Sequence, residues 1–207
     1  MASGTRPTVR GVVAIVRLRA HEPPDELVAA LVAGGVTTVE VTAPTPGALA
    51  AVGRWTREPG VTVGVGTVRS AAQARAALDA GAAFLVTPTT AEDVLREIRV
   101  PVLAGATTPT EIERAWRLGA AAVKVFPVGA LGGPAYVRAV REPLDDVPLV
   151  PTGGVRVEDV AAYRRAGCTG VGVGSALVSD DVVAGGDWGG LAARARQLAD
   201  AWGDPGD

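Results

Sequence analysis

The sequence predicts a single (β/α)8 barrel of the α/β class, known as a TIM barrel, and three observations lead to this fold. Short β-branched apolar runs alternate with longer Ala- and Leu-rich segments, at a spacing of about 20 residues. The apolar runs are nearly continuous, as expected for parallel strands that are covered on both faces. Eight strand–helix units follow one another without a linker or a change in composition, which favours a closed barrel over an open doubly wound sheet.

Each strand is expected where a run of mainly Val, Ile, Ala and Thr lies between turn residues. The first run begins at Gly11, and the sixth, AAVKVF, carries a single charge near its centre. In chain order, the eight expected strands are residues 11–16, 36–42, 61–66, 83–87, 101–104, 121–126, 148–151 and 169–174.

The segments between the strands show helical patterns with recognisable ends. Ser70 and Thr108 are of the type that caps helix N-termini, and Pro109 suits the first helical turn. Gly81 and Gly119 follow two of the segments, where glycine adopts the left-handed conformation at little cost. The clearest helical patterns are residues 25–33, 71–80, 109–118 and 157–166, with a last one around 191–202.

The size and composition of the chain favour one soluble, cytoplasmic globular domain. With 207 residues it can bury about 70% of its unfolded surface, so we expect one domain over 1–207 with frayed tails at about 1–10 and 203–207. One Cys excludes an intramolecular disulfide, and one Cys with one His does not make the usual zinc site, so neither a metal nor a cofactor is predicted. A net charge of −2 gives no sign of a nucleic-acid surface. The first residues are polar, so no signal peptide is expected. No apolar run reaches about 20 residues, so no membrane span is expected.

Two charged residues lie inside apolar strands. Lys124 is the only Lys among 20 basic residues, which suggests a position that Arg cannot fill. Lysine can lose its proton when desolvated, and the free amine condenses with carbonyl groups to form an imine. Glu40 is the second embedded charge, and a carboxylate beside such an amine can shuttle protons during the reaction. The alternative is an inert buried Lys–Glu pair at the barrel mouth, and only reactivity separates the two interpretations.

Glycine-rich segments follow the seventh and eighth expected strands. Gly153 and Gly154 come after Thr152, and Gly174 precedes Ser175. Bare backbone N–H groups near helix N-termini bind phosphate, and this end of a (β/α)8 barrel commonly does so. Together with Lys124, these segments predict a substrate that has a ketone near the amine and a phosphate at its far end.

Three further side chains are expected at strand ends. Arg17 can clamp a carboxylate with its planar guanidinium, although a strand-end Arg exposed to water is an equal alternative. Thr67 and Thr87 can donate hydroxyl groups to a bound keto acid, but threonine is common in strands and each is weak evidence by itself.

Taken together, these motifs resemble the class I 2-keto-3-deoxy-6-phosphogluconate (KDPG) aldolase family, also described as 4-hydroxy-2-oxoglutarate (KHG) aldolases. The resemblance runs from about Val12 to Trp202. The matching segments occur in order and read VAIVR, AGGV with VEVT, GVGTV, VTP, TPTE, VKVFP, PTGGV and GVGSALV.

The resemblance implies a function and roles for the site residues. It implies that Lys124 forms the Schiff base and that Glu40 is the general acid and base. The other implied site residues contact the pyruvyl end or the phosphate of the substrate, and they are Arg17, Thr67, Thr152, Gly153, Gly154, Gly174 and Ser175. It also implies a metal-independent homotrimer, acting as a carbon–carbon lyase in carbohydrate metabolism of the Entner–Doudoroff type. Many members carry an arginine four residues after the catalytic glutamate, where this chain has Pro44.

The expected reaction is cleavage of KDPG to pyruvate and glyceraldehyde 3-phosphate. The same chemistry on 4-hydroxy-2-oxoglutarate, or on the galactonate epimer of the sugar acid, stays open. So does a barrel that binds a sugar phosphate without turning it over.

Overall fold

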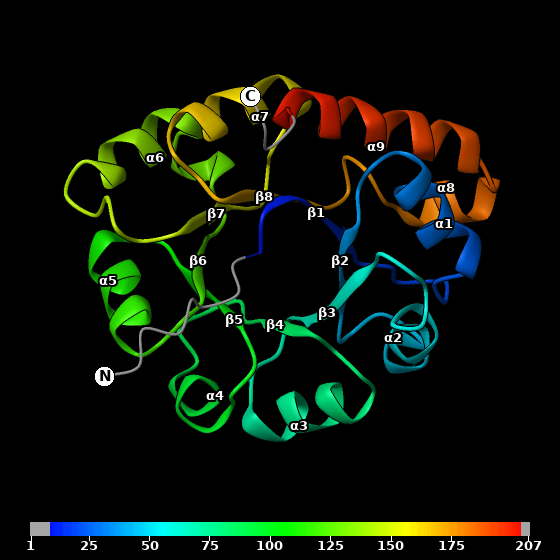
Figure 1. Ribbon diagram of the computed structural model, residues 1–207, viewed down its shortest axis with the longest axis horizontal. Coiled ribbons are helices and arrows are strands. Elements are labelled where there is room, and N and C mark those ends of the chain that lie inside the picture. Colours follow the sequence, from blue (N-terminus) through cyan, green and yellow to red (C-terminus); the bar gives the residue numbers. More distant parts are fainter. Residues whose placement is uncertain (1–8, 204–207) are drawn as a thin grey trace.

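The computed structural model describes residues 9–203, in which eight parallel strands form a TIM barrel surrounded by helices (Figure 1). The expected tails at 1–10 and 203–207 lie outside these residues, apart from Val9, Arg10 and Gly203. The strands are β1 Gly11–Val16, β2 Thr38–Thr42, β3 Thr62–Gly66, β4 Phe84–Val86, β5 Val102–Ala106, β6 Ala122–Val125, β7 Leu149–Pro151 and β8 Gly170–Val173.

The strand order confirms the predicted barrel. Hydrogen-bonded neighbours run β7-β6-β5-β4-β3-β2-β1-β8. The seam between β7 and β8 is closed by a parallel bridge between Thr152 and Gly172, and the Thr169 N–H donates to the Leu149 carbonyl over 3.0 Å. Closure brings the carboxyl ends of all eight strands to one face, where sites in this fold are built.

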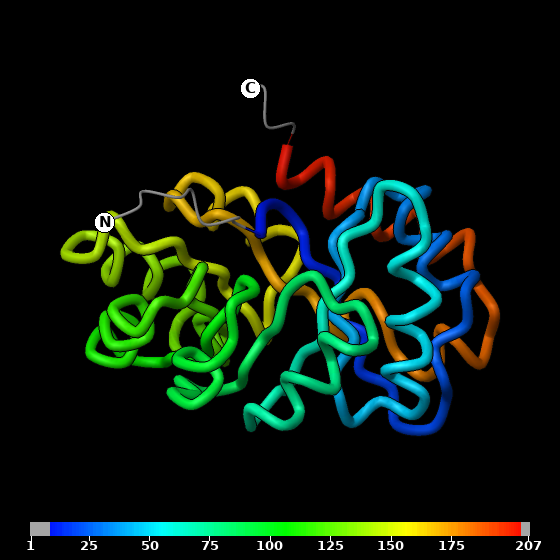
Figure 2. Tube along the Cα trace, turned by 60° about the horizontal axis from the view of Figure 1, so that its bottom comes forward, coloured from blue at the N-terminus to red at the C-terminus, as the bar shows by residue number. Residues whose placement is uncertain are grey.

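Helices follow the strands and cover their outer faces. Their bounds are α1 Asp25–Ala33, α2 Ala48–Trp55, α3 Ala71–Asp79, α4 Glu92–Glu97, α5 Pro109–Arg117, α6 Pro134–Arg141, α7 Val157–Arg165, α8 Asp180–Gly185 and α9 Trp188–Trp202, with a 3-10 turn η1 at Gly129–Leu131. The first and last helices, α1 and α9, lie side by side (Figures 1 and 2), and a Cβ added at Gly34 would lie 2.5 Å from the Ala192 carbonyl oxygen. None of the helices within residues 9–203 has the length and apolarity needed to cross a bilayer.

The expected caps are confirmed. The Ser70 hydroxyl accepts a hydrogen bond from the Gln73 N–H at the start of α3. At α5, the Thr108 hydroxyl accepts from the Glu111 N–H, and the Glu111 carboxylate accepts from the Thr108 N–H over 2.7 Å. The hydrogen bond that the Thr108 N–H donates to the Glu111 carboxylate lowers the pKa of Glu111. The bounds of β1 are as expected, and those of the other strands differ by at most two residues, because backbone pairing and not side-chain character ends a strand.

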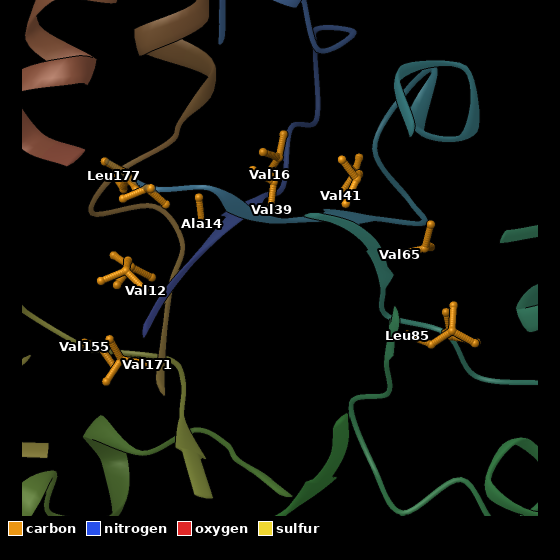
Figure 3. Packing of buried hydrophobic residues seen from close by; sticks show 14 of the residues in the cluster. Val12, Ala14, Val16, Val39, Val41, Val65, Leu85, Val155, Val171 and Leu177 are labelled. Atoms are coloured by element: carbon orange, nitrogen blue, oxygen red, sulfur yellow. The ribbon is translucent and has the colours of Figure 1, made fainter. Parts of the chain in front are cut away.

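Alternation along the strands separates two buried layers. Val39 and Val41 on β2 pack outward against helices, as do Val12, Ala14 and Val16 on β1 (Figure 3). The opposite faces fill the barrel interior with a second apolar cluster, made of Val9, Val13, Phe84, Val86, Leu103, Ala122 and Val150. Since successive side chains point to opposite faces, Glu40 and Lys124 point into the barrel.

Candidate active site

A cavity of about 430 Å³ opens where the carboxyl ends of β1, β6, β7 and β8 meet. It contains most of the residues that the sequence predicted for the site. Those that line it are Arg17, Lys124, Thr152, Gly153, Gly154, Gly174 and Ser175.

Lys124 lines this cavity and forms a buried pair with Glu40, which lies behind it and does not line the cavity. Lys124 Nζ lies 3.6 Å from Glu40 Oε1, and the side chains are only 7% and 2% exposed. Nζ also lies 5.5 Å from the centre of the Phe126 ring, which lines the cavity as well. The amine and carboxylate are close enough to exchange a proton directly or through one water. This geometry suits both the catalytic and the inert-pair interpretations.

The position of Glu40 depends on glycine in the neighbouring strand. A Cβ added at Gly66 on β3 would lie 1.7 Å from Glu40 Oε1, so no other residue leaves room for this carboxylate. Glu40 Oε1 is buried and accepts no hydrogen bond from the described residues. Its charge is therefore balanced by Lys124 across the barrel interior.

Arg17 is held at the end of β1 by Thr67. Arg17 Nη2 donates to Thr67 Oγ1 over 2.9 Å. Thr67 has φ of 60°, in the left-handed region that β-branched residues avoid, at a cost of about 1–3 kcal/mol. The guanidinium thus has a defined position, although it is exposed to solvent. This arrangement is therefore compatible with both interpretations that the sequence left open, a carboxylate clamp and a strand-end arginine exposed to water.

We expect Arg17→Ala to weaken pyruvate binding by about 10- to 100-fold, because charge-assisted hydrogen bonds to the carboxylate are lost. Affinity for glycerol 3-phosphate should stay close to that of the wild type. Calorimetric titration with both compounds measures this difference. An equal loss of affinity for the two would contradict a carboxylate role for Arg17.

The glycines after β7 and β8 form a wall of backbone. Gly153 and Gly154 have φ of 82° and 81°, and a Cβ at Gly153 would lie 2.9 Å from the Phe126 ring. Within the described residues, the N–H groups of Gly154, Ser175 and Ala176 donate no hydrogen bond. Free N–H groups on consecutive turns of this kind form an anion-binding concavity.

Two predicted threonines differ in their placement. Thr152 lines the cavity, and its hydroxyl donates to the Val150 carbonyl over 3.2 Å. Thr87 is fully buried and does not line the cavity. Its hydroxyl donates to the Thr89 carbonyl over 2.6 Å and accepts from the Gly105 N–H. The structure therefore gives Thr87 a backbone partner in the β4–α4 loop, and its contact with substrate stays a prediction.

Sequence reasoning missed Arg19 and Asp180, which also line the cavity. The Asp180 carboxylate accepts hydrogen bonds from the N–H groups of Arg19 and Ala20 and from His21 Nδ1. The two backbone bonds lower the pKa of Asp180 to about 2. Arg19 could have been identified from the sequence, since it lies two residues after Arg17. Asp180 is joined to this segment only by the fold.

The Asp180 contacts predict a pH dependence of stability. The pKa of Asp180 is about 2 in the fold and near its ordinary value of 3.8 when unfolded, so its contribution is present above about pH 4 and is lost as the pH falls towards 2. Asp180→Asn should therefore lower the free energy of unfolding at pH 7, and this difference should shrink between pH 4 and pH 2. Urea unfolding over this range measures it, with Asp181→Asn as the neighbouring control. A difference that is independent of pH would contradict the assignment.

Comparisons with known proteins agree with this geometry. A family model described as "Aldolase: KDPG and KHG aldolase" matches residues 6–193. A 2-dehydro-3-deoxy-phosphogluconate aldolase of Pseudomonas aeruginosa is 38% identical over 166 residues, covering 77% of this chain and 74% of the relative. One of Treponema pallidum is 36% identical, with 90% of each chain covered. A KHG/KDPG aldolase of Escherichia coli is 32% identical, with 93% and 92% covered.

Solved structures show the same fold. One described as native KDPGal has 30% identity and a TM-score of 0.83, with 92% of this chain and 93% of that chain covered. The KDPG aldolase of Legionella pneumophila has 25% identity and a TM-score of 0.79, with 90% and 93% covered, and its structure holds pyruvate captured as a covalent carbinolamine intermediate.

Proposed function

This chain belongs to the KDPG and KHG aldolase family of class I aldehyde-lyases, and from that premise we propose that it cleaves KDPG to pyruvate and glyceraldehyde 3-phosphate. The observation that carries the proposal is the buried amine of Lys124, 3.6 Å from the Glu40 carboxylate, at a cavity walled by glycine backbone.

The reaction begins at Lys124. Its amine, once it has given up a proton, attacks the C2 ketone of the substrate to form a carbinolamine, which loses water to give a protonated imine. Glu40, directly or through a water, then takes the proton of the C4 hydroxyl group. The C3–C4 bond breaks, its electron pair moves into the imine to form an enamine, and the aldehyde leaves. Protonation of the enamine at C3 and hydrolysis of the imine release pyruvate and restore the amine.

Binding of the substrate is divided between two ends of the cavity. We assign the C1 carboxylate to Arg17, which Thr67 holds in place, and the phosphate to the backbone N–H groups of Gly154 and Ser175. In this chain Pro44 occupies the position of the arginine in other members, so Arg17 is the cation that we assign to the carboxylate.

The assembly and location follow from the same premise. We infer a homotrimer of single-domain subunits in the cytoplasm. Large apolar side chains that such an assembly can cover are exposed at Leu49 and Val157. Light scattering of the purified chain measures the subunit number.

Borohydride reduction in the presence of pyruvate tests the imine mechanism. Because Lys124 is the only lysine, peptide mapping assigns a reduced adduct to one side chain and distinguishes it from the terminal amine. We expect a single adduct on Lys124, and none when either pyruvate or borohydride is omitted. The absence of an adduct in the complete reaction would reject the proposal.

The substrate is tested separately by kcat/KM. The compounds to compare are KDPG, its unphosphorylated form, the 6-phosphogalactonate epimer and 4-hydroxy-2-oxoglutarate. KDPG should have the highest value. A higher kcat/KM for the epimer or for 4-hydroxy-2-oxoglutarate would show that KDPG is not the preferred substrate, and it would leave the imine mechanism unchanged.

A further inference from the structure

The segment that follows β1 presents two arginines to the cavity. Arg17 and Arg19 both line it and are exposed, whereas Leu18 between them is 2% exposed. The alternation of β1 therefore continues beyond the last strand residue, Val16, and places both guanidinium groups on the cavity side.

Contacts from two directions hold this segment in place. The Thr45 hydroxyl accepts from the Leu18 N–H over 3.2 Å and donates to the Val16 carbonyl over 3.3 Å. From the other side, the Asp180 carboxylate accepts from the N–H groups of Arg19 and Ala20, each over 3.0 Å. The backbone that carries Arg19 is thus fixed between the β2–α2 loop and the start of α8.

The two guanidinium groups have different surroundings. Arg17 is bonded to Thr67, which follows β3. Arg19 makes no side-chain hydrogen bond or ion pair with the residues from 9 to 203, and its backbone is bound beside the segment that follows β8. Within this part of the chain, Arg19 is therefore a cation without a side-chain partner, and it lines the same cavity as the glycine-rich wall.

Asp180 does not cancel the charge of Arg19. Its oxygens accept hydrogen bonds from two backbone N–H groups and from His21 Nδ1, so its carboxylate is engaged by neighbours other than the Arg19 guanidinium. Among the described residues, the donors available to a ligand at this end include the Arg19 guanidinium and the N–H groups of Gly154, Ser175 and Ala176.

We propose that Arg19 determines specificity for substrates with a phosphate at the end distant from the ketone, by pairing with that phosphate opposite the glycine-rich wall. Guanidinium and phosphate form two parallel charge-assisted hydrogen bonds, which add geometric selectivity to charge. The inference rests on the proposed function. It assigns the two anionic ends of the substrate to two arginines of one segment, Arg17 for the carboxylate and Arg19 for the phosphate.

Arg19→Gln tests this assignment with kinetics on matched substrates. We expect KM for KDPG to rise on the order of tenfold with little change in kcat, because the lost charge-assisted contact stabilises the bound substrate and the transition state equally. The unphosphorylated sugar acid and 4-hydroxy-2-oxoglutarate, which ends in a carboxylate, should keep their wild-type values.

Arg19→Lys should restore part of the affinity, since it keeps the charge and loses the planar fork. Arg57→Gln, an exposed site outside the cavity, is the control.

A second measurement separates this inference from the proposed function. Calorimetric titration with glycerol 3-phosphate needs no turnover, and Arg19→Gln should weaken binding on the order of tenfold. If the wild type fails to cleave KDPG but this loss is seen, the proposed function is wrong and the role of Arg19 stands. If the wild type cleaves KDPG and Arg19→Gln changes all substrates equally or none, the role of Arg19 is wrong. If Arg19→Gln weakened the binding of 4-hydroxy-2-oxoglutarate and KDPG equally, Arg19 would attract anions in general and would not recognise phosphate.

Discussion

Lys124→Arg is expected to abolish both pyruvate trapping and aldol cleavage, while the protein remains folded. Guanidinium stays protonated and does not attack a carbonyl group, so the imine is not formed. The positive charge opposite Glu40 is retained, and the buried carboxylate keeps a counter-ion. Activity should fall to the background of the assay, measured by pyruvate release and by intact mass after borohydride reduction.

The same variant separates the catalytic pair from an inert one. If Lys124 and Glu40 only hold the barrel together, Lys124→Arg should preserve any activity. Lys124→Met is the companion variant, since it leaves Glu40 buried without a partner and should destabilise the protein by roughly 3–5 kcal/mol. Loss of activity in the arginine variant with an unchanged unfolding midpoint supports imine chemistry. Retained trapping would overturn the mechanism.

Gly66→Ala is expected to lower kcat by about 10²-fold or more, although residue 66 carries no reactive group. The new Cβ would lie 1.7 Å from Glu40 Oε1, so the carboxylate must leave its position opposite Lys124. Proton transfer at the C4 hydroxyl group then loses its positioned base. Steady-state cleavage of KDPG measures the effect.

The matched control is Gly189→Ala in α9, where a Cβ meets no atom within 4 Å and alanine favours the helix. This control should keep wild-type activity and stability. Glu40→Gln removes the base without crowding the barrel, and its kcat should fall by a similar factor. Wild-type kcat in Gly66→Ala would show that the position of Glu40 is unimportant for catalysis.

The repeating fold was largely readable from local patterns. The eight strands, the barrel and the caps at Ser70 and Thr108 were predicted and are confirmed, because apolar runs, capping side chains and terminal glycines act over a few residues. The helices α2, α4, α6 and α8, of six to eight residues each, were not assigned bounds, since so few residues show no reliable period.

The candidate site was only partly readable. Lys124 stood out in the sequence as a single charge in an apolar strand, but its direction into the barrel was established only by the structure. Thr87 looked equivalent to Thr67 in sequence, and neither lines the cavity, yet the Thr67 hydroxyl accepts from the cavity residue Arg17 whereas the Thr87 hydroxyl is bonded to backbone. The direction of a side chain at a strand end depends on the loop that follows, and composition does not reveal it.

The sequence by itself determined the period of the elements, the presence of two charges inside apolar strands and the membership of an aldolase family, because these depend on local spacing and on short motifs. Tertiary structure decided which charges meet. The 3.6 Å approach of Lys124 to Glu40 needs β2 and β6 to face each other across a closed barrel, with glycine at 66 beside the carboxylate. The placement of Arg19 likewise needs Asp180, from the far end of the chain, to bind its backbone. Such contacts arise only when the chain closes on itself, since they join residues that no local pattern relates.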